Sequence, residues 1–113
     1  MEYQRIIEAI SLLSLMQLNM LARSNIVDII KVSGTSRTSA VAGAIAGVFR
    51  ENKRAEIQAI GAGAVNQAVK ALILARGYLS EEGVAIYCLP EFVDVDISGK
   101  IRTAVKLTVE ELE

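Results

Sequence analysis

Two short segments of the sequence carry residue types suited to binding a phosphate group. The first, residues 33–39 (SGTSRTS), holds five hydroxyl side chains and Arg37. The second, residues 61–66 (GAGAVN), begins with two closely spaced glycines. Hydroxyls, arginine and the partly positive backbone N–H groups at a helix start are common phosphate ligands. Both segments are therefore candidates for phosphate contacts.

Each segment also has an interpretation that involves no ligand. Residues 33–39 could cap a helix and otherwise face solvent, and residues 61–66 could allow a helix to pack closely on a sheet. The dinucleotide-binding fingerprint is incomplete, because Asn66 stands where a third glycine is required and no acidic residue closes a following strand. The sequence leaves helix capping or packing and phosphate contact as open alternatives.

The composition excludes several classes of function. The chain has 113 residues, no histidine, one cysteine (Cys88) and a net charge of −1. Histidine-dependent catalysis, zinc sites and a disulfide framework are thereby excluded, and we expect no enzyme activity, no metal and no cofactor. Because the chain is no polycation, any nucleic-acid binding must use a local patch.

The first 24 residues differ in character from the rest. Residues 9–22 carry no charge, and their apolar spacing predicts a helix over residues 3–22. Fourteen residues span about 21 Å as a helix, which is short of the ~30 Å hydrocarbon core of a membrane. We therefore expect no membrane span. The apolar face could pack on its own domain, on a second subunit or on a lipid surface.

The remaining sequence alternates strands and helices. Strands are predicted at 26–33 and 55–60, and a helix between them at 39–52 buries Val41, Ile45, Val48 and Phe49. A second helix follows residues 61–63 and is expected to end at Arg76-Gly77. Its predicted core stripe consists of Val65, Val69, Leu72 and Ile73. The glycines at 43 and 47 are interpreted as positions of close backbone packing.

The C-terminal part reads as strands joined by a turn. A strand over 84–89 is expected to stop at Pro90, and a hairpin follows over 93–97 and 101–109. Its alternation predicts one buried and one wet face. Asp94 and Asp96 are expected to face Arg102 and Lys106 across the hairpin.

The resulting order is β-α-β-α-β-β with an extra N-terminal helix, which predicts an α+β fold of two layers with a mixed four-stranded sheet. We expect a helical extension over residues 1–25 and one domain over 26–113. In such a fold both strand-to-helix loops lie at the same end of parallel strands. Lys31, Arg37 and Lys70 are then expected near that end.

Longer strings in this domain resemble the stage V sporulation protein S (SpoVS) family. They are residues 31–79, with AEIQAIGAGAVNQAVKA (55–71) as the most specific part, then IYCLPEF (86–92) and RTAVKLTVE (102–110). The resemblance covers about residues 27–111. Members of the family are small bacterial proteins that affect sporulation and septation, and they resemble the Alba superfamily of nucleic-acid-binding proteins.

This resemblance implies a cytoplasmic, dimeric or higher oligomeric protein that binds DNA or RNA and is not an enzyme. The Alba-like binding surface uses the loop before the first helix of the fold, the start of the second and the terminal hairpin. By position, the implied residues are Lys31, Ser33, Ser36, Arg37, Thr38, Ser39, Gly61, Gly63, Asn66, Gln67 and Lys70, with Ser98, Gly99, Lys100 and Arg102 at the hairpin tip.

The sequence supports two hypotheses from different classes. The first is a regulator that contacts nucleic-acid phosphates through the two strand-to-helix loops. The second is an interaction or assembly factor with the same fold and no nucleic-acid binding, motivated by the near-neutral charge, the acidic residues of the hairpin and the spare apolar helix. A continuous positive surface would favour the first, and a mixed surface with an apolar patch would favour the second.

Overall fold

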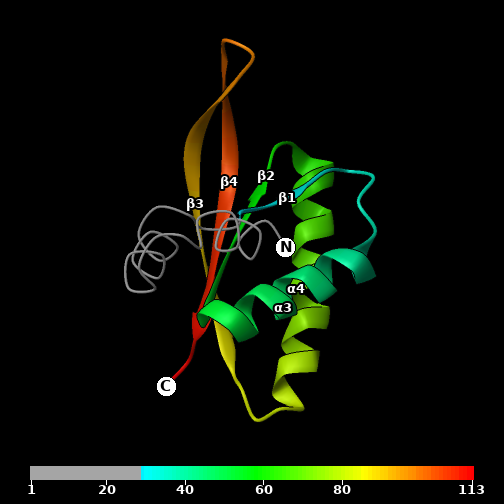
Figure 1. The fold of residues 1–113 in the computed structure, drawn as a ribbon. Coiled ribbons are helices and arrows are strands. Elements are labelled where there is room, and N and C mark those ends of the chain that lie inside the picture. Colours follow the sequence, from blue (N-terminus) through cyan, green and yellow to red (C-terminus); the bar gives the residue numbers. More distant parts are fainter. Residues whose placement is uncertain (1–28) are drawn as a thin grey trace, which may run out of the picture.

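A computed structural model describes residues 29–113, and Figure 1 shows their fold. The element order is β1 (Ile29–Val32), α3 (Thr38–Asn52), β2 (Arg54–Ala59), α4 (Ala62–Ser80), β3 (Ile86–Ile97) and β4 (Lys100–Glu111). The predicted N-terminal helix and residues 26–28 of the first predicted strand lie outside the described residues. Within 29–113 the predicted β-α-β-α-β-β order is confirmed.

The four strands form one mixed sheet in the order β1-β2-β4-β3. β1 and β2 are parallel, whereas β4 runs antiparallel to both of its neighbours. Both helices cover the same face of the sheet (Figure 1) and pack mainly on β1 and β2. The predicted two-layer α+β fold is therefore confirmed. None of the helices in the described part of the chain is long and apolar enough to cross a membrane.

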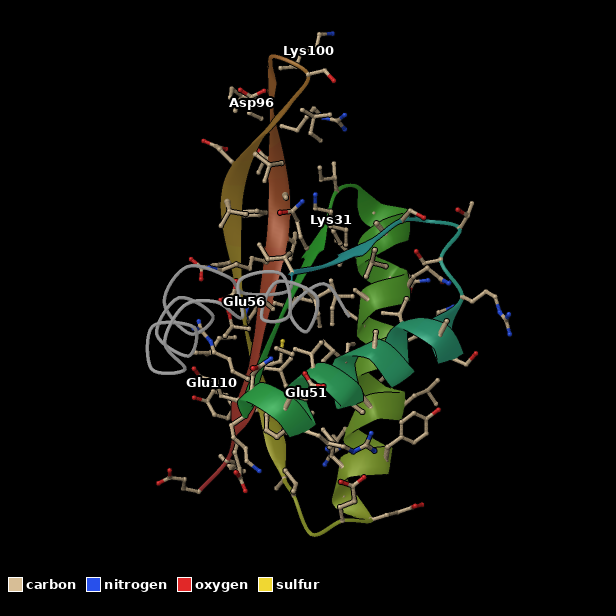
Figure 2. All side chains as sticks on the ribbon, in the orientation of Figure 1. Lys31, Glu51, Glu56, Asp96, Lys100 and Glu110 are labelled. Atoms are coloured by element: carbon tan, nitrogen blue, oxygen red, sulfur yellow. The ribbon has the colours of Figure 1, made fainter. Side chains whose placement is uncertain are left out.

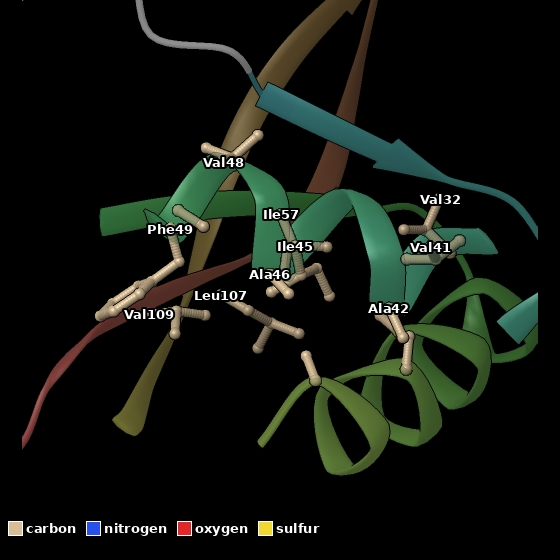
Figure 3. Close-up of a cluster of buried hydrophobic side chains, with 14 of the residues drawn as sticks. Val32, Val41, Ala42, Ile45, Ala46, Val48, Phe49, Ile57, Leu107 and Val109 are labelled. Atoms are coloured by element: carbon tan, nitrogen blue, oxygen red, sulfur yellow. The ribbon is translucent and has the colours of Figure 1, made fainter. Parts of the chain in front are cut away.

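The core lies between α3 and the sheet, where Figure 3 shows the buried side chains. α3 buries the four large residues that its helical spacing predicts, Val41, Ile45, Val48 and Phe49. They meet Ile57 of β2 and Leu107 and Val109 of β4, which all face the helices. The apolar alternation of these two central strands places the core under α3.

The predicted core stripe of α4 is wrong for Val69 and Ile73, whereas Val65 and Leu72 pack against the core while partly exposed. The buried residues of this helix are small, except for one at its end: Ala64, Ala68, Ala71, Ala75 and Leu79. Of the four predicted residues, Val69 and Ile73 are exposed and Val65 and Leu72 are half-buried. Alanine brings the helix axis close to its neighbours, so the larger side chains lie on the flank of the helix instead of beneath it.

α4 also continues past the predicted stop at Arg76-Gly77. It ends at Ser80, and this additional turn fully buries Leu79. The glycine with a positive φ angle is Gly83 (φ 81°), which turns the chain towards β3. Burial of one leucine therefore outweighs the helix-ending tendency of Gly77.

The close packing expected for the two glycines of α3 is also wrong for the described chain. A Cβ atom built on Gly43 or on Gly47 would meet no atom within 4 Å. Gly43 is exposed and Gly47 half-buried. These glycines lie on the outer side of α3, where no described element packs against them.

The sequence predicts that the strand stops at Pro90, but β3 continues through this residue. Pro90 lies opposite Leu107 of β4 within an unbroken twelve-residue strand. β3 is an edge strand, so a residue without an N–H group is tolerated where that group would face away from β4. The terminal hairpin is consequently longer than predicted.

The hairpin projects beyond the other two strands as an arm (Figure 1). Its two turn residues, Ser98 and Gly99, both have positive φ angles, as a tight hairpin turn with the favoured twist requires. The buried face predicted for the hairpin does not extend to the tip, because Ile97 and Ile101 are exposed.

The expected charge pairing across the hairpin is wrong, because Arg102 lies opposite Val95 and Lys106 opposite Glu91. Asp94 lies opposite Thr103 and Asp96 opposite Ile101. An oxygen of Asp96 accepts a 2.9 Å hydrogen bond from the backbone N–H of Gly99. Lys106 instead pairs with Glu91, with 3.6 Å between Nζ and Oε2.

An ion pair between Arg50 and Glu82 links the end of α3 to the turn after α4, and it predicts a pH effect. The guanidinium donates to both carboxylate oxygens, with Nη2 2.6 Å from Oε2. These hydrogen bonds lower the pKa of Glu82 below its ordinary value of 4.5. A carboxyl whose pKa is lower in the folded state adds stability above the unfolded pKa, and this stability is lost as the pH falls through the folded value.

We therefore expect the urea midpoint of the wild type to fall more steeply below about pH 4.5 than that of Glu82→Gln. Equilibrium unfolding at a series of pH values measures the difference. Curves that stay parallel throughout the acid range would contradict the proposed contribution of this pair.

Candidate nucleic-acid interface

The two predicted phosphate-binding segments lie in contact at one end of the helical layer. A Cβ atom on Gly63 would lie 3.7 Å from the Cα atom of Gly34, so the loop before α3 and the start of α4 approach as backbone against backbone. This proximity agrees with the expectation that both strand-to-helix loops share one end of the sheet. We call residues 33–39 together with 61–63 the paired loops.

Hydroxyl groups hold the first of the paired loops in a compact turn. The Ser36 N–H donates to the Ser33 carbonyl at 3.1 Å, and the Ser33 N–H donates to the Ser36 hydroxyl at 2.9 Å. The Ser33 hydroxyl also lies 3.1 Å from that of Thr35. These bonds fix the loop without the help of a ligand.

Gln67 connects the loop to α4. Its amide nitrogen donates to the Ser36 carbonyl at 2.8 Å and to the Thr38 hydroxyl at 3.3 Å. Gln67 and Thr38 are both half-buried and engaged with each other. They therefore position the paired loops rather than offering side chains to a ligand.

Removing this connection should loosen the loop without unfolding the domain. We expect Gln67→Ala to cost about 1 kcal/mol and to speed amide hydrogen exchange in residues 33–38. The neighbouring exposed amide provides the control, since Asn66→Ala should leave this exchange unchanged. Equal exchange in the two variants would show that Gln67 does not hold the loop.

Neither helix start is capped by its N-cap side chain. The N-cap residues are Arg37 for α3 and Gly61 (φ 94°) for α4, and neither makes a side-chain cap hydrogen bond. The hydroxyls expected as caps therefore do not serve as N-cap residues. Neither first turn contains an acidic residue. The partly positive start of each helix thus has no neutralising carboxylate in its first turn.

Charge is unevenly distributed along the helical layer. No acidic residue occurs in 29–50 or in 57–80, the segments that contain the paired loops. Acidic residues occur instead at the end of α3 (Glu51) and on β2 and β4 (Glu56 and Glu110), as Figure 2 shows. The two strand glutamates pair with Arg54, Glu56 at 3.1 Å and Glu110 at 3.5 Å. Among the described residues, no ion pair involves Arg37 or Lys70.

The structure separates the fifteen predicted binding residues into three groups. The paired loops bring together Ser33, Ser36, Arg37, Thr38, Ser39, Gly61 and Gly63, and the first turns of α4 add Asn66, Gln67 and Lys70. Lys31 alternates with the buried Val32 and so lies on the helix-free face of the sheet. Ser98, Gly99, Lys100 and Arg102 lie on the projecting arm, and Figure 2 shows Lys100 at its tip.

The sequence did not predict an exposed apolar surface between α4 and β3, which we call the apolar face. Val69, Leu72 and Ile73 of α4 line a groove with Ile86 and Cys88 of β3. Further along the same face of β3, Phe92 is 77% exposed, because the helices lie over β1 and β2 instead. The expectation that Cys88 is a core residue is therefore incomplete. This thiol is half-buried at the groove, and burial raises its pKa.

A comparison with known families gives a match for this chain. The family model described as Stage V sporulation protein S (SpoVS) matches residues 28–112, which include all of the described elements and the paired loops. The match extends over most of the chain and agrees with the resemblance of the strings at 31–79, 86–92 and 102–110. The chain therefore belongs to the stage V sporulation protein S family.

Proposed function

We propose that this protein acts in sporulation as a non-enzymatic, cytoplasmic regulator that binds nucleic acid through phosphate contacts at the paired loops. The single observation that carries the proposal is the contact of the loop before α3 with the start of α4, where both helices begin without a side-chain cap and without an acidic residue in the first turn. Backbone N–H groups and the helix dipoles favour an anion at such a place. Arg37 and the exposed hydroxyl of Ser39 supply further phosphate ligands there.

The few basic groups at this surface predict weak binding with little reading of base sequence. Each phosphate neutralised by a lysine or arginine contributes about 0.9 to the slope of log affinity against log salt. Arg37 and Lys70 on the helical side, with Lys31 on the other face, set a small slope. The arm is a second contact only through Lys100 and Arg102, since Asp94 and Asp96 on β3 repel phosphate.

A titration of the purified full chain into fluorescent double-stranded DNA and single-stranded RNA at several salt concentrations tests this function. We expect affinity that falls log-linearly with salt, and the tighter ligand identifies the preferred nucleic acid. Absence of binding at low salt to both probes would overturn the proposal.

The apolar face between α4 and β3 favours a second candidate function, which is self-association in an assembly that does not require nucleic acid. Ile73 on the flank of α4 is 62% exposed, and Phe92 on the uncovered strand β3 is 77% exposed. Both residues belong to the apolar face. A second copy related by a two-fold axis would place its own α4 flank on this strand. We therefore propose a homodimer, or a higher oligomer, formed through this face.

Charged substitution tests the face directly. We expect Ile73→Glu to shift the protein to monomer in analytical ultracentrifugation while the circular dichroism spectrum is retained. Tyr78→Glu provides a control at another exposed position of α4 outside the groove. An oligomer that survives Ile73→Glu would exclude this face, and a wild-type monomer would exclude the assembly.

A further inference from the structure

A hollow of about 640 Å³ lies on the opposite side of the sheet from the helices, where the arm meets the ends of β1 and β2. Its walls include Ile29, Ile60, Val95 and Ile97. Ile29, Lys31 and Gln58 line it from one face of the sheet, because Lys31 lies opposite Gln58 and both alternate with helix-facing neighbours. Val32 and Asp96, which alternate with residues of that face, also line it. Its volume is within the range of sites that hold small molecules or single ligand groups.

Polar side chains line the hollow at only a few places. Gln58 contributes an amide with one acceptor and two donors, which no hydrogen bond within residues 29–113 uses. Lys31 and Ser33 line the side next to the loop, and Asp96 lines the side of the arm. A ligand there would meet apolar walls, one amide and a cation on one side only.

The hollow is continuous with the paired loops. Ser33 and Gly34 line it, and both residues also belong to the first loop, where Gly34 approaches Gly63. A ligand that spans both places must carry an anionic phosphate joined to a flat, largely apolar group with hydrogen-bonding edges. A nucleotide with an unstacked base has this chemistry.

We propose that the hollow holds the base of an unpaired nucleotide whose phosphate contacts the loop at residues 33–39. This inference rests on the proposed function, and it adds that the bound nucleic acid presents an extrahelical or single-stranded base. The aliphatic walls exclude water from the faces of the base. Gln58 pairs with its edge, as an amide does with adenine, and Lys31 lies on the side of the phosphate.

Binding of the full chain to three fluorescent duplexes tests the inference. The first is a perfect DNA duplex, the second carries one bulged adenosine, and the third carries an abasic residue in the same bulge. The abasic duplex has the flexibility of a bulge without its base. We expect the wild type to bind the adenosine bulge about tenfold more tightly than the other two.

Two variants and one matched control locate this preference. Gln58→Leu, which removes the amide at similar size, should bind all three duplexes with equal affinity. Val95→Asp should also lose the preference, because it places a charge on the wall of the hollow. Val93→Asp introduces the same charge on the same face of β3 at a residue that does not line the hollow, and it should retain the preference.

The outcomes separate this inference from the function on which it rests. If the wild type binds all three duplexes with equal, salt-dependent affinity, the hollow holds no base and the phosphate contacts of the paired loops stand. Retention of the preference in Gln58→Leu likewise overturns the inference. No binding to any duplex at low salt overturns the proposed function, and the inference with it.

Discussion

Replacing Phe49 by alanine is expected to lower the free energy of unfolding by about 3–5 kcal/mol. Phe49 is 1% exposed near the end of α3, where it lies against the sheet with Val109 of β4 (Figure 3). The substitution removes the largest fully buried side chain of the described residues and leaves a cavity that alanine does not fill. Because native domains are stable by only about 5–15 kcal/mol, the variant should be partly unfolded at elevated temperature.

Urea unfolding followed by circular dichroism measures this effect, and the chain offers a control of the same residue type. Phe92 is 77% exposed, so Phe92→Ala should change the free energy of unfolding by less than about 0.5 kcal/mol at concentrations too low for self-association. Similar losses in the two variants would contradict the placement of the core under α3.

Removing the two exposed basic side chains on the helical side of the proposed interface should have the largest effect on nucleic-acid binding. We expect Arg37→Gln/Lys70→Gln to weaken binding to duplex DNA at every sequence and to reduce the salt slope by about two units. Each residue contributes one phosphate contact, and the counterions it would have released stay bound to the DNA. Fluorescence anisotropy at four or more salt concentrations gives both affinity and slope.

A second double variant removes the same number of positive charges from the opposite end of the helical layer. Lys53→Asn/Arg76→Gln suits this purpose, because Lys53 has a positive φ angle of 61° that asparagine also tolerates. We expect this variant to keep the wild-type slope. If both double variants lose slope equally, binding depends on net charge and not on the paired loops.

Much of the fold could be predicted because periodicity and residue size point in the same direction in α3 and β2. The spacing of Val41, Ile45 and Phe49 identifies the buried face of α3, since large apolar side chains lie on only one side of that helix. α4 is apolar on most of its surface, so its pattern does not identify which side of the helix is buried. Its buried side consists of alanines, and the preference for large residues selects the wrong face.

Less of the candidate site could be predicted, because it depends on tertiary contacts. Residue types alone identify the paired loops, and parallel strands place them at one end. The position of Gln67 within a hydrogen-bond network is set by the approach of α4 to the loop and leaves no local signal. The hollow likewise requires β3 to continue past Pro90. Proline usually breaks a strand, so the sequence predicts that the strand ends there.

The outer edge of β3 has a consequence for how this protein avoids uncontrolled polymerisation. A twelve-residue strand at the end of a sheet offers a template on which further chains could add strand by strand into a fibril. Pro90 removes one donor near the middle of that edge, and the carboxylates of Glu91, Asp94 and Asp96 follow within six residues. These residues oppose edge-to-edge growth and leave the outer side of β3 unsuited to strand addition.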